Sequence, residues 1–361
     1  MFSCFYSILL LLIITGCGEK KTDQQTDWAI LPFEKVDSVN PVLNPGTSVF
    51  NCPILGKSVK WDEKDVFNPA AVVRDGKIFL LFRAEDIVGK YAGTSRIGLA
   101  VSEDGLHFTK MPDPVLFPDN DSLKIYEWEG GVEDPRIIES EDGTYFLTYT
   151  AYDGNLARLL IASSKDLVHW TKHGLVFPGK YKDTWSKSGA IVGKQMGEKI
   201  IAQKINGKYW MYWGDTDLFL ASSDDLIHWT AEETSDGKLK SVLKPRKGYF
   251  DSRLVESGPY ALIREKGIVL LYNGMNLEKD DWDPALGAGA YCSGQALFDL
   301  NDPSKLIDRL EKNFLKPDKP YEISGQVNQV CFIEGMVPFK GKWFLYYGTA
   351  DSKIAVAVSG I

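Results

Sequence analysis

One short phrase returns along this chain at nearly constant intervals. It occupies residues 97–108, 160–170 and 219–229, and a partial copy occupies residues 354–359. Each full copy is an apolar run that leads through a Ser-x-Asp step to an aromatic residue. The aromatic ends Phe108, Trp170 and Trp229 are 62 and 59 residues apart. A fixed period of this size is typical of a repeat architecture, which limits the fold more than any other feature of the sequence.

A second apolar run precedes each copy, and a turn introduces it. The pairs Asp75-Gly76, Asp142-Gly143 and Asn206-Gly207 are typical of hairpin turns, because glycine supplies the positive φ that such turns need. Similar runs at 267–272 and 342–347 complete five units with almost no helical periodicity. Units of antiparallel strands arranged radially make a β-propeller. We therefore predict an all-β, five-bladed β-propeller, and a β-sandwich is the alternative.

Composition and charge limit the class of partner. Hydrophobic residues make up 44% of the chain and charged residues 25%, which is enough apolar material for a core. The formal net charge of −8 argues against a nucleic-acid backbone as a partner.

The N-terminus differs from the rest of the chain. Residues 7–15 form an apolar run that is too short to span a membrane but fits the core of a signal peptide. Ile14-Thr15-Gly16-Cys17 resembles the lipobox of bacterial lipoproteins, although no Lys or Arg precedes the run. That resemblance implies a lipid on Cys17 and a place in the bacterial cell envelope, in the periplasm or at the outer-membrane surface. We predict a lipoprotein signal peptide at 1–17, a polar tether and N-terminal extension at 18–44, and a catalytic domain at 45–361.

Cysteines and histidines offer little for chemistry. Three of the five cysteines remain beyond Cys17, with no Cys-x-x-Cys pair, so the sequence predicts neither a zinc site nor a dense disulfide framework. His107, His169 and His228 recur at one place of the repeat, which indicates a scaffold role. The chemistry should therefore depend on carboxylates.

The carboxylates of interest interrupt the repeat. Asp134 stands between Glu133 and Pro135 on a predicted inner strand, where an unpaired charge would be costly. A turn with a Glu–Arg ion pair is the alternative there. Asp215 and Asp351 occupy comparable places after their strands, so we expect them to converge near the central axis.

Several motifs, taken in order, look like glycoside hydrolase family 130. They are Phe67-Asn68-Pro69-Ala70, Phe82-Arg83-Ala84-Glu85, Ser95-Arg96-Ile97-Gly98-Leu99-Ala100, Gly131-Val132-Glu133-Asp134-Pro135-Arg136, Thr148-Tyr149-Thr150-Ala151 and Tyr346-Tyr347-Gly348-Thr349-Ala350-Asp351. The resemblance runs from about Trp61 to the C-terminus. It implies a five-bladed propeller that acts on β-mannosides, either as a phosphorylase or as an inverting hydrolase.

The resemblance also implies roles for individual residues. Asp134 matches the general acid, whose proton is relayed through the mannosyl 3-hydroxyl to the leaving oxygen. The residues expected to contact substrate are Asn68, Arg83, Arg96, Arg136 and Asp351. Arg158 and Lys204 match positions that bind phosphate in the phosphorylases.

The sequence departs from the phosphorylase pattern at three places. Trp213-Gly214, followed by Asp215, replaces a His-Arg pair; Glu256 stands before Gly258-Pro259; and Tyr272-Asn273-Gly274 replaces Tyr-His-Gly. Each change removes positive charge or adds negative charge. A carboxylate beside phosphate costs on the order of several kcal/mol, whereas the same group can deprotonate a water.

We therefore predict an inverting hydrolase that releases mannose from β-1,4- or β-1,2-linked mannosides, with no cofactor. Glu256 is the first choice of base, and Asp215 is the second choice or its helper. A phosphorylase that uses inorganic phosphate and yields mannose 1-phosphate is the alternative. A non-catalytic, lipid-anchored glycan-binding propeller and a furanoside glycosidase are further alternatives. The linkage and the oligomeric state stay open.

Overall fold

The computed structural model describes residues 26–91 and 93–360, together with Met1. Cys17, the signal peptide predicted at 1–17 and most of the predicted tether lie outside the described residues. The described part is built of strands, with two four-residue helices, α1 (Lys124–Glu127) and α2 (Pro320–Ile323). The prediction of an all-β fold is confirmed. None of the described helices has the length and apolar character needed to cross a membrane.

The strands pair antiparallel in successive groups that follow chain order. The first group is β4 (Asp65–Arg74), β5 (Lys77–Glu85), β6 (Ser95–Ser102) and β7 (Thr109–Lys110). The second is β8 (Gly131–Glu139), β9 (Tyr145–Tyr152), β10 (Ala157–Ser164) and β11 (Thr171–Leu175). The third is β12 (Ala190–Met196), β13 (Lys199–Ala202), β14 (Tyr209–Trp213), β15 (Leu218–Ser223), β16 (Trp229–Ala231) and β17 (Ser241–Leu243).

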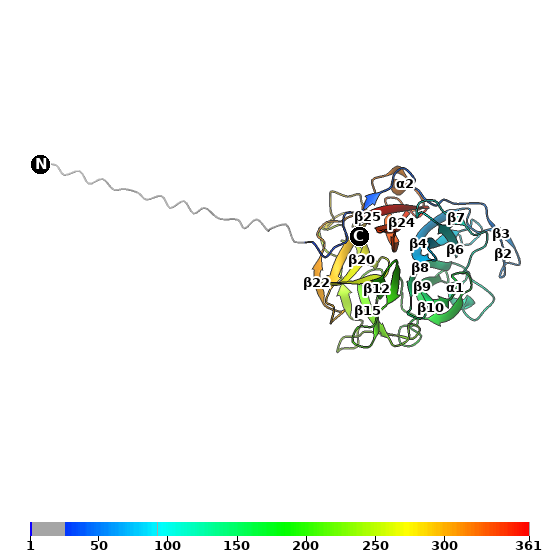
Figure 1. The fold of residues 1–361 in the computed structure, drawn as a ribbon, viewed down its shortest axis with the longest axis horizontal. Coiled ribbons are helices and arrows are strands. Elements are labelled where there is room, and N and C mark those ends of the chain that lie inside the picture. The colour runs from blue at the N-terminus through cyan, green and yellow to red at the C-terminus, as the bar shows by residue number, and fades with distance from the viewer. Residues whose placement is uncertain (2–25, 92, 361) are drawn as a thin grey trace.

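Two further strand groups follow, which makes five in all. One is β18 (Leu254–Ser257), β19 (Ala261–Arg264), β20 (Gly267–Met275), β21 (Tyr291–Phe298) and β22 (Leu306–Arg309). The other is β23 (Cys331–Phe339), β24 (Lys342–Thr349), β25 (Lys353–Gly360) and β1 (Glu34–Lys35). A separate hairpin pairs β2 (Val49–Cys52) with β3 (Lys57–Lys60). Figure 1 shows the groups around a common centre.

The repeated phrase forms the strand after each hairpin, as predicted: β6, β10, β15 and β25. The exit turns of the three full copies share one hydrogen-bond pattern, in which an aspartate accepts from two backbone N–H groups and from a histidine ring. Asp166, for example, accepts from the backbone of Val168 and His169, and its second oxygen lies 2.8 Å from His169 Nδ1. The histidines are exposed, so they cap turns at the surface.

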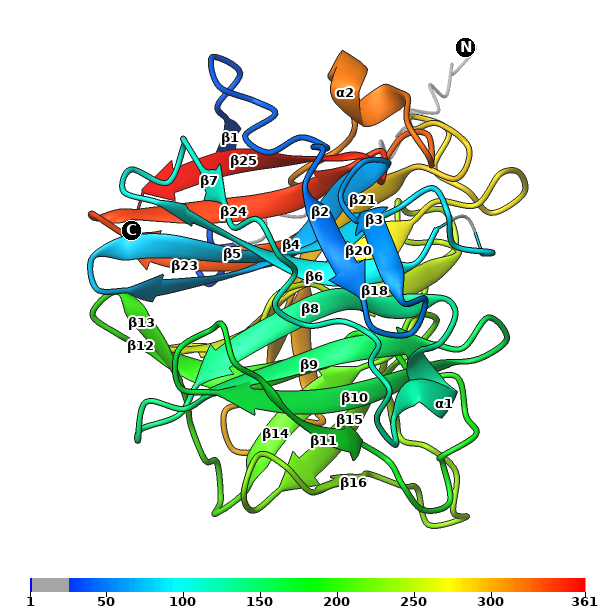
Figure 2. The ribbon, with the colours of Figure 1, turned by 90° about the vertical axis from the view of Figure 1, so that its right-hand side faces the viewer.

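The first strand of each group lies toward the centre. β4, β8 and β23 are buried along almost their whole length, and β12 pairs in parallel with β19 of the next group. Strands of neighbouring groups run across the view of Figure 2 in similar directions, so their connections gather at two opposite ends. Side chains at the start of the inner strands are therefore brought together at one end of the molecule.

The segment 26–44 packs on the outside of this arrangement. β1 pairs with β25, so the last group contains a strand from each end of the described chain. Trp28 Nε1 donates to Asp308 at 2.9 Å, and the backbone of Ile30 bonds with the Gln295 amide. Cys52, Cys292 and Cys331 are buried free thiols.

Candidate active site

Two β-bulges begin the site. The pairing of β4 with β5 slips between Phe67 and Pro69, and that of β8 with β9 slips between Glu133 and Arg136. Asn68 and Asp134 stand in these slips with φ of 46° and 47°. The following proline lacks the N–H that would continue the ladder, which favours a bulge there. Asn68 Nδ2 donates to Asp134 Oδ1 at 2.9 Å, so the two bulges meet.

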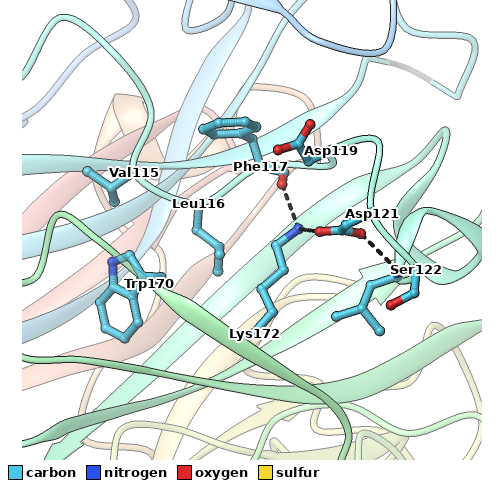
Figure 3. Close-up of a pocket in the computed structure, with 9 residues that line it drawn as sticks. Val115, Leu116, Phe117, Asp119, Asp121, Ser122, Trp170 and Lys172 are labelled. Atoms are coloured by element: carbon cyan, nitrogen blue, oxygen red, sulfur yellow. Dashed lines mark hydrogen bonds and ion pairs between the residues drawn. The ribbon is translucent and has the colours of Figure 1, made fainter.

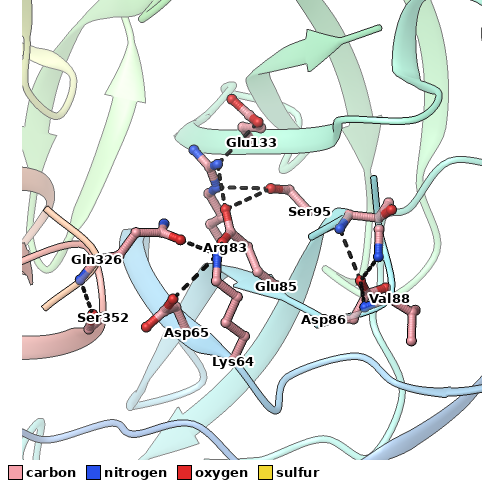
Figure 4. Close-up of polar contacts among 12 residues, drawn as sticks. Lys64, Asp65, Arg83, Glu85, Asp86, Val88, Ser95, Glu133, Gln326 and Ser352 are labelled. Atoms are coloured by element: carbon pink, nitrogen blue, oxygen red, sulfur yellow. Dashed lines mark hydrogen bonds and ion pairs between the residues drawn. The ribbon is translucent and has the colours of Figure 1, made fainter. Parts of the chain in front are cut away.

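Arg83, near the end of β5, joins this pair to further carboxylates. Its Nη1 donates to Asp134 Oδ1 at 3.1 Å, and its Nη2 contacts Glu85 at 2.7 Å and Glu133 at 3.1 Å. Its Nε donates to Ser95 Oγ at 3.0 Å (Figure 4). The guanidinium therefore lies at the centre of a ring of oxygen acceptors.

A wider polar shell holds Glu85 in place. Lys64 Nζ donates to Glu85 Oε2 at 2.8 Å and lies 3.7 Å from Asp65 (Figure 4). Burial acts to raise the pKa of Glu85, but Arg83 and Lys64 outweigh it and lower that pKa. Glu85 thus stays ionised and fixes the orientation of Arg83.

Asp134 is buried between two cations. Lys187 Nζ lies 3.6 Å from Asp134 Oδ2, on the side away from the Arg83 and Asn68 bonds. Burial acts to raise the pKa of Asp134, yet Arg83 and Lys187 hold it below its ordinary value. Burial likewise acts to lower the pKa of Lys187, but Asp134 and Glu256 raise it. The unliganded site therefore contains an Asp134 carboxylate and a Lys187 ammonium.

Glu256, on β18, faces Lys187 from another group. It is 4% exposed, and Ser188 Oγ donates to its Oε1. Burial raises the pKa of Glu256 to about 7, although Lys187 acts in the opposite direction. Asp215 adds a further negative charge close to Glu256 and Lys187 and accepts from Trp185 Nε1 at 2.7 Å.

Asp351 reaches the same centre from the end of β24. Burial raises its pKa to about 7, while Arg83 lowers it and Asp134 raises it. Tyr291 stands at the start of β21. Burial and the negative charges of Glu256, Asp351 and Asp215 raise its pKa, whereas Lys187 acts to lower it. The charges of Asp215 and Asp351 both act on Lys187 and Tyr291, and their convergence near the central axis stays a prediction.

Two of the predicted substrate contacts are buried and bonded to protein groups. Arg96 is 1% exposed, and its Nη1 bonds to Asp86 at 2.6 Å and to the Thr94 carbonyl at 3.0 Å. Ser95 already faces Arg83, and adjacent residues of a strand point to opposite faces, so Arg96 must point away from the site. Arg136 is 2% exposed and lies beneath Asp134, where it contacts the Glu334 carboxylate at 2.6 Å.

The two predicted phosphate contacts are also placed elsewhere. The Arg158 guanidinium bonds through each of its three nitrogens to protein groups of neighbouring loops: Asp153, Asp183 and the Lys182 carbonyl. Lys204 is exposed, and its Nζ lies 4.9 Å above the ring of Tyr209. Burial raises the pKa of Tyr209, and the carboxylates of Glu141 and Asp142 in the β8–β9 turn raise it further, which places Lys204 near that turn. Asp134 stands near the other end of β8, about 15 Å along the strand.

Sequence reasoning missed Lys187, Ser188, Glu85, Glu133 and Glu334. One signal could have found some of them: a polar residue stands directly before Pro or Gly within, or just before, four of the inner strands. Asn68-Pro69, Asp134-Pro135, Ser188-Gly189 and Glu334-Gly335 share this pattern. The pairing of β23 with β24 also slips at Glu334.

A separate pocket of about 310 Å³ shares no lining residue with this site. It lies beside Phe117, Asp121, Trp170 and Lys172 (Figure 3). Lys172 Nζ donates there to the Phe117 carbonyl at 2.8 Å and to Glu127 at 2.6 Å, so it ties the loop to α1 and β11. Among residues 26–91 and 93–360, no group of three or more His, Cys, Asp or Glu side chains has the geometry of a metal site.

Comparison with known proteins identifies the family. Residues 36–361 match the sequence model of glycoside hydrolase family 130, which is described as beta-1,4-mannooligosaccharide phosphorylase. The chain therefore belongs to glycoside hydrolase family 130, and the resemblance inferred from its motifs is confirmed.

Relatives of both reaction types are similar to this chain. A 1,2-beta-oligomannan phosphorylase from Thermoanaerobacter sp. (strain X514) is 32% identical over 308 residues, which cover 83% of this chain and 91% of that protein. A glycosyl hydrolase structure from Bacteroides ovatus is 49% identical with a TM-score of 0.89, covering 92% of this chain and 94% of that one. A further structure is 47% identical with a TM-score of 0.90 and the same coverages. It comes from work stating that the family "contains glycoside hydrolases that target beta-1,2 mannosidic linkages in Candida mannan".

Proposed function

We propose that this chain is an inverting glycoside hydrolase that removes a terminal mannosyl unit from β-mannosides. In this proposal the five strand groups are the blades of a five-bladed β-propeller, and the site lies where their inner strands begin. Family membership supports the substrate class. The choice of water as nucleophile comes from the charge of the site.

The charge balance is the observation that favours water. The cations around Asp134 are Arg83, Lys187 and Arg136, and each already contacts at least one carboxylate. The acidic side chains of the same set are Glu85, Glu133, Asp134, Asp215, Glu256, Glu334 and Asp351. Burial raises the pKa of Glu133, Glu256 and Asp351 to about 7 and raises that of Glu334 as well, so these groups are partly protonated near neutral pH. A phosphate dianion would still have to bind where each cation is already paired with a carboxylate and where further carboxyl groups can ionise, which opposes its binding. A neutral water meets no such barrier.

Glu256 acts as the general base. Its pKa of about 7 suits a group that takes a proton near neutral pH. The water oxygen attacks the anomeric carbon and gives its proton to Glu256, while the glycosidic bond breaks on the opposite face. Ser188 and Lys187 orient and stabilise the Glu256 carboxylate before the proton is taken.

Asp134 supplies the proton of the leaving oxygen, relayed through the mannosyl 3-hydroxyl. An acid must be protonated, and Arg83 with Lys187 keeps the free Asp134 ionised. The 3.6 Å separation between Lys187 Nζ and Asp134 Oδ2 exceeds a hydrogen bond. A sugar hydroxyl inserted there would separate the charges, raise the pKa of Asp134 and allow it to carry the proton.

Phosphorolysis is the second candidate. The family description and the curated relatives named as phosphorylases favour it over hydrolysis. In that reaction inorganic phosphate is the co-substrate and attacks in place of water. No other cofactor is required in either reaction.

One experiment separates the two reactions. The purified chain is incubated with β-1,2- and β-1,4-mannobiose in phosphate-free buffer and in about 10–100 mM phosphate, which lies above the usual KM range of about 1 μM to 1 mM. Free mannose released at equal rates in both buffers supports hydrolysis. Strict dependence on phosphate, with mannose 1-phosphate as product, establishes phosphorolysis. Binding of mannobiose without any product indicates a glycan-binding protein.

We further propose that Cys17 is lipidated and anchors the chain in the bacterial cell envelope, on the basis of its lipobox-like sequence. Expression in a bacterial host with labelled palmitate tests this directly. The wild-type chain should carry label and sediment with membranes, whereas Cys17→Ala should lose both properties. An unlabelled wild-type chain would contradict the proposal.

A further inference from the structure

An exposed tryptophan stands at the edge of the carboxylate site. Trp185 is 46% exposed, and among the described large hydrophobic side chains only Trp185 and Tyr249 are both aromatic and exposed. Arg246 covers the ring of Tyr249 at 4.3 Å. No aromatic or cationic side chain of the described residues lies against the Trp185 ring. An indole that is nearly half exposed loses part of the hydrophobic stabilisation that full burial would give, so packing alone does not explain its position.

Trp185 belongs to the segment that supplies the site. Two residues further along, Lys187 reaches Asp134, and Ser188 donates to Glu256. Two residues of extended chain span at most about 7 Å, so the backbone that carries the indole lies beside the backbone that carries Lys187 and Ser188.

This segment is fixed to its surroundings at several points. Ser186 N donates to the Ala157 carbonyl at 3.1 Å, and its Oγ accepts from Leu159 N at 3.0 Å. Arg158 bonds to the Lys182 carbonyl and to Asp183. The backbone beneath Trp185 is therefore held firmly on both sides.

The indole is fixed as well. Its Nε1 donates to Asp215 Oδ2 at 2.7 Å, a charge-assisted hydrogen bond that sets the plane of the ring. Asp215 also lies close to Lys187 and Glu256. A surface tryptophan without a role would not need a carboxylate of the site to orient it.

Resting on the proposed function, we propose that Trp185 is the stacking platform for the sugar on the leaving-group side of the scissile bond. The apolar C–H face of that pyranose lies against the indole. Asp215 is then a positioning residue that orients Trp185, and Glu256 alone acts as the base. The site thus prefers β-mannosides whose leaving group is a second sugar over those with a small leaving group.

Binding and turnover test this assignment separately. Mannobiose and mannose are titrated by calorimetry into Asp134→Asn protein, with and without Trp185→Ala or Trp185→Phe. We expect Trp185→Ala to weaken mannobiose binding by about tenfold, as for the loss of an aromatic contact, and mannose binding much less. Trp185→Phe, which keeps a ring, should retain most of the affinity. Met196→Ala, at an exposed position on the β12–β13 hairpin, is the control. Equal mannobiose affinity in Trp185→Ala and the control would overturn the proposal, whether or not the wild-type chain turns over substrate.

Turnover distinguishes the two proposals. Wild-type and Trp185→Ala proteins are compared on β-mannobiose and on β-mannosyl fluoride, whose leaving group is too small to reach the indole. A loss in kcat/KM that is about tenfold larger for mannobiose supports stacking, and equal losses contradict it. Asp215→Asn, which can still accept the indole N–H, should follow the pattern of Trp185→Phe. A collapse of both activities in Asp215→Asn would instead make Asp215 the base. If wild-type protein cleaves neither substrate, the proposed function fails, and the calorimetry still decides the stacking role.

Discussion

The two oxygens of Asp134 have different surroundings. Oδ1 accepts from Asn68 and from Arg83, whereas Oδ2 faces Lys187 at 3.6 Å without a hydrogen bond. One oxygen is therefore held by the protein, and the other is available to a ligand. In the proposed mechanism, this asymmetry lets an ionised carboxylate take up a proton when the substrate binds.

The first prediction concerns this carboxyl group. Asp134→Asn should lower kcat by about 10³-fold, in the range expected for loss of a general acid. The protein should stay folded, because the amide can still accept from Asn68. Activity assays and thermal unfolding check this, with the exposed Asp113→Asn as control. Retained turnover would remove Asp134 from the catalytic role.

The second prediction uses the raised pKa of Glu256. If its carboxylate takes the proton of water, kcat/KM should fall as the pH drops through about 7. Glu256→Gln should remove turnover at every pH. An acid limb centred near pH 4.5 would indicate a base other than Glu256.

The same shift has a consequence for stability. A carboxyl group whose pKa is raised on folding favours the folded state at low pH, and this contribution is lost as the pH rises from about 4.5 through about 7. Glu256→Gln should therefore raise Tm more at pH 8 than at pH 5. Scanning calorimetry at the two pH values measures the difference. An equal change at both would mean that the folded pKa is not raised.

At the scale of single elements, the site depends on the loop at 182–188. Arg158 holds its beginning, and Ser186 fixes its middle to β10. Lys187 and Ser188 then extend from a defined backbone toward Asp134 and Glu256. We therefore expect Arg158 to affect the proposed reaction through this loop.

The third prediction follows from that role. Arg158→Ala should lower kcat/KM by about tenfold or more, because small displacements of catalytic groups are costly. Arg158→Lys should recover part of the loss, and the loss should be the same with and without phosphate. The control is Arg74→Ala, which removes a partly exposed pair with Asp75. An effect confined to the KM for phosphate would restore the original expectation of a phosphate contact.

The sequence predicts the positions of strands and turns better than it predicts the side of a strand to which a side chain points. The repeat located the hairpins, because turn dipeptides and apolar runs act locally. Arg96 and Ser95 were not distinguished, since a one-residue change reverses the face of a strand. The partners of Arg158 include Asp183, which lies 25 residues further along the chain. Lys204 matches a phosphate-binding position of the family motif, but it lies near the β8–β9 turn, whereas Asp134 lies near the other end of β8.

At the scale of the molecule, the N-terminal segment joins groups that are distant in sequence. Trp28 and Ile30 contact the fourth group, and β1 extends the last one. Lys35 Nζ lies 2.6 Å from Glu322, whose side chain is fully buried. Tyr347 also donates to Glu322, so the segment is connected to the centre of its group.

The fourth prediction tests this connection. Lys35→Ala should destabilise the protein by about 3 kcal/mol, because it leaves the buried Glu322 without its cation. Lys319→Ala, which removes an exposed pair with Asp37, should have much less effect, because solvent screens that pair. Urea unfolding of both variants gives the comparison. Equal and small effects would show that the segment adds little to stability.

The pairing of β1 with β25 also sets an order of events during synthesis. Glu34 is opposite Val358, so a strand made early has its partner more than 300 residues further along the chain. The hydrogen bonds that add β1 to the last group can form only after the chain has been synthesised through β25. Until then the edge of β1 is unpaired, and such contacts between distant residues form slowly. A chain truncated shortly before residue 353 would hold all of the site carboxyl groups and still lack both β25 and the pairing that fixes the N-terminal segment.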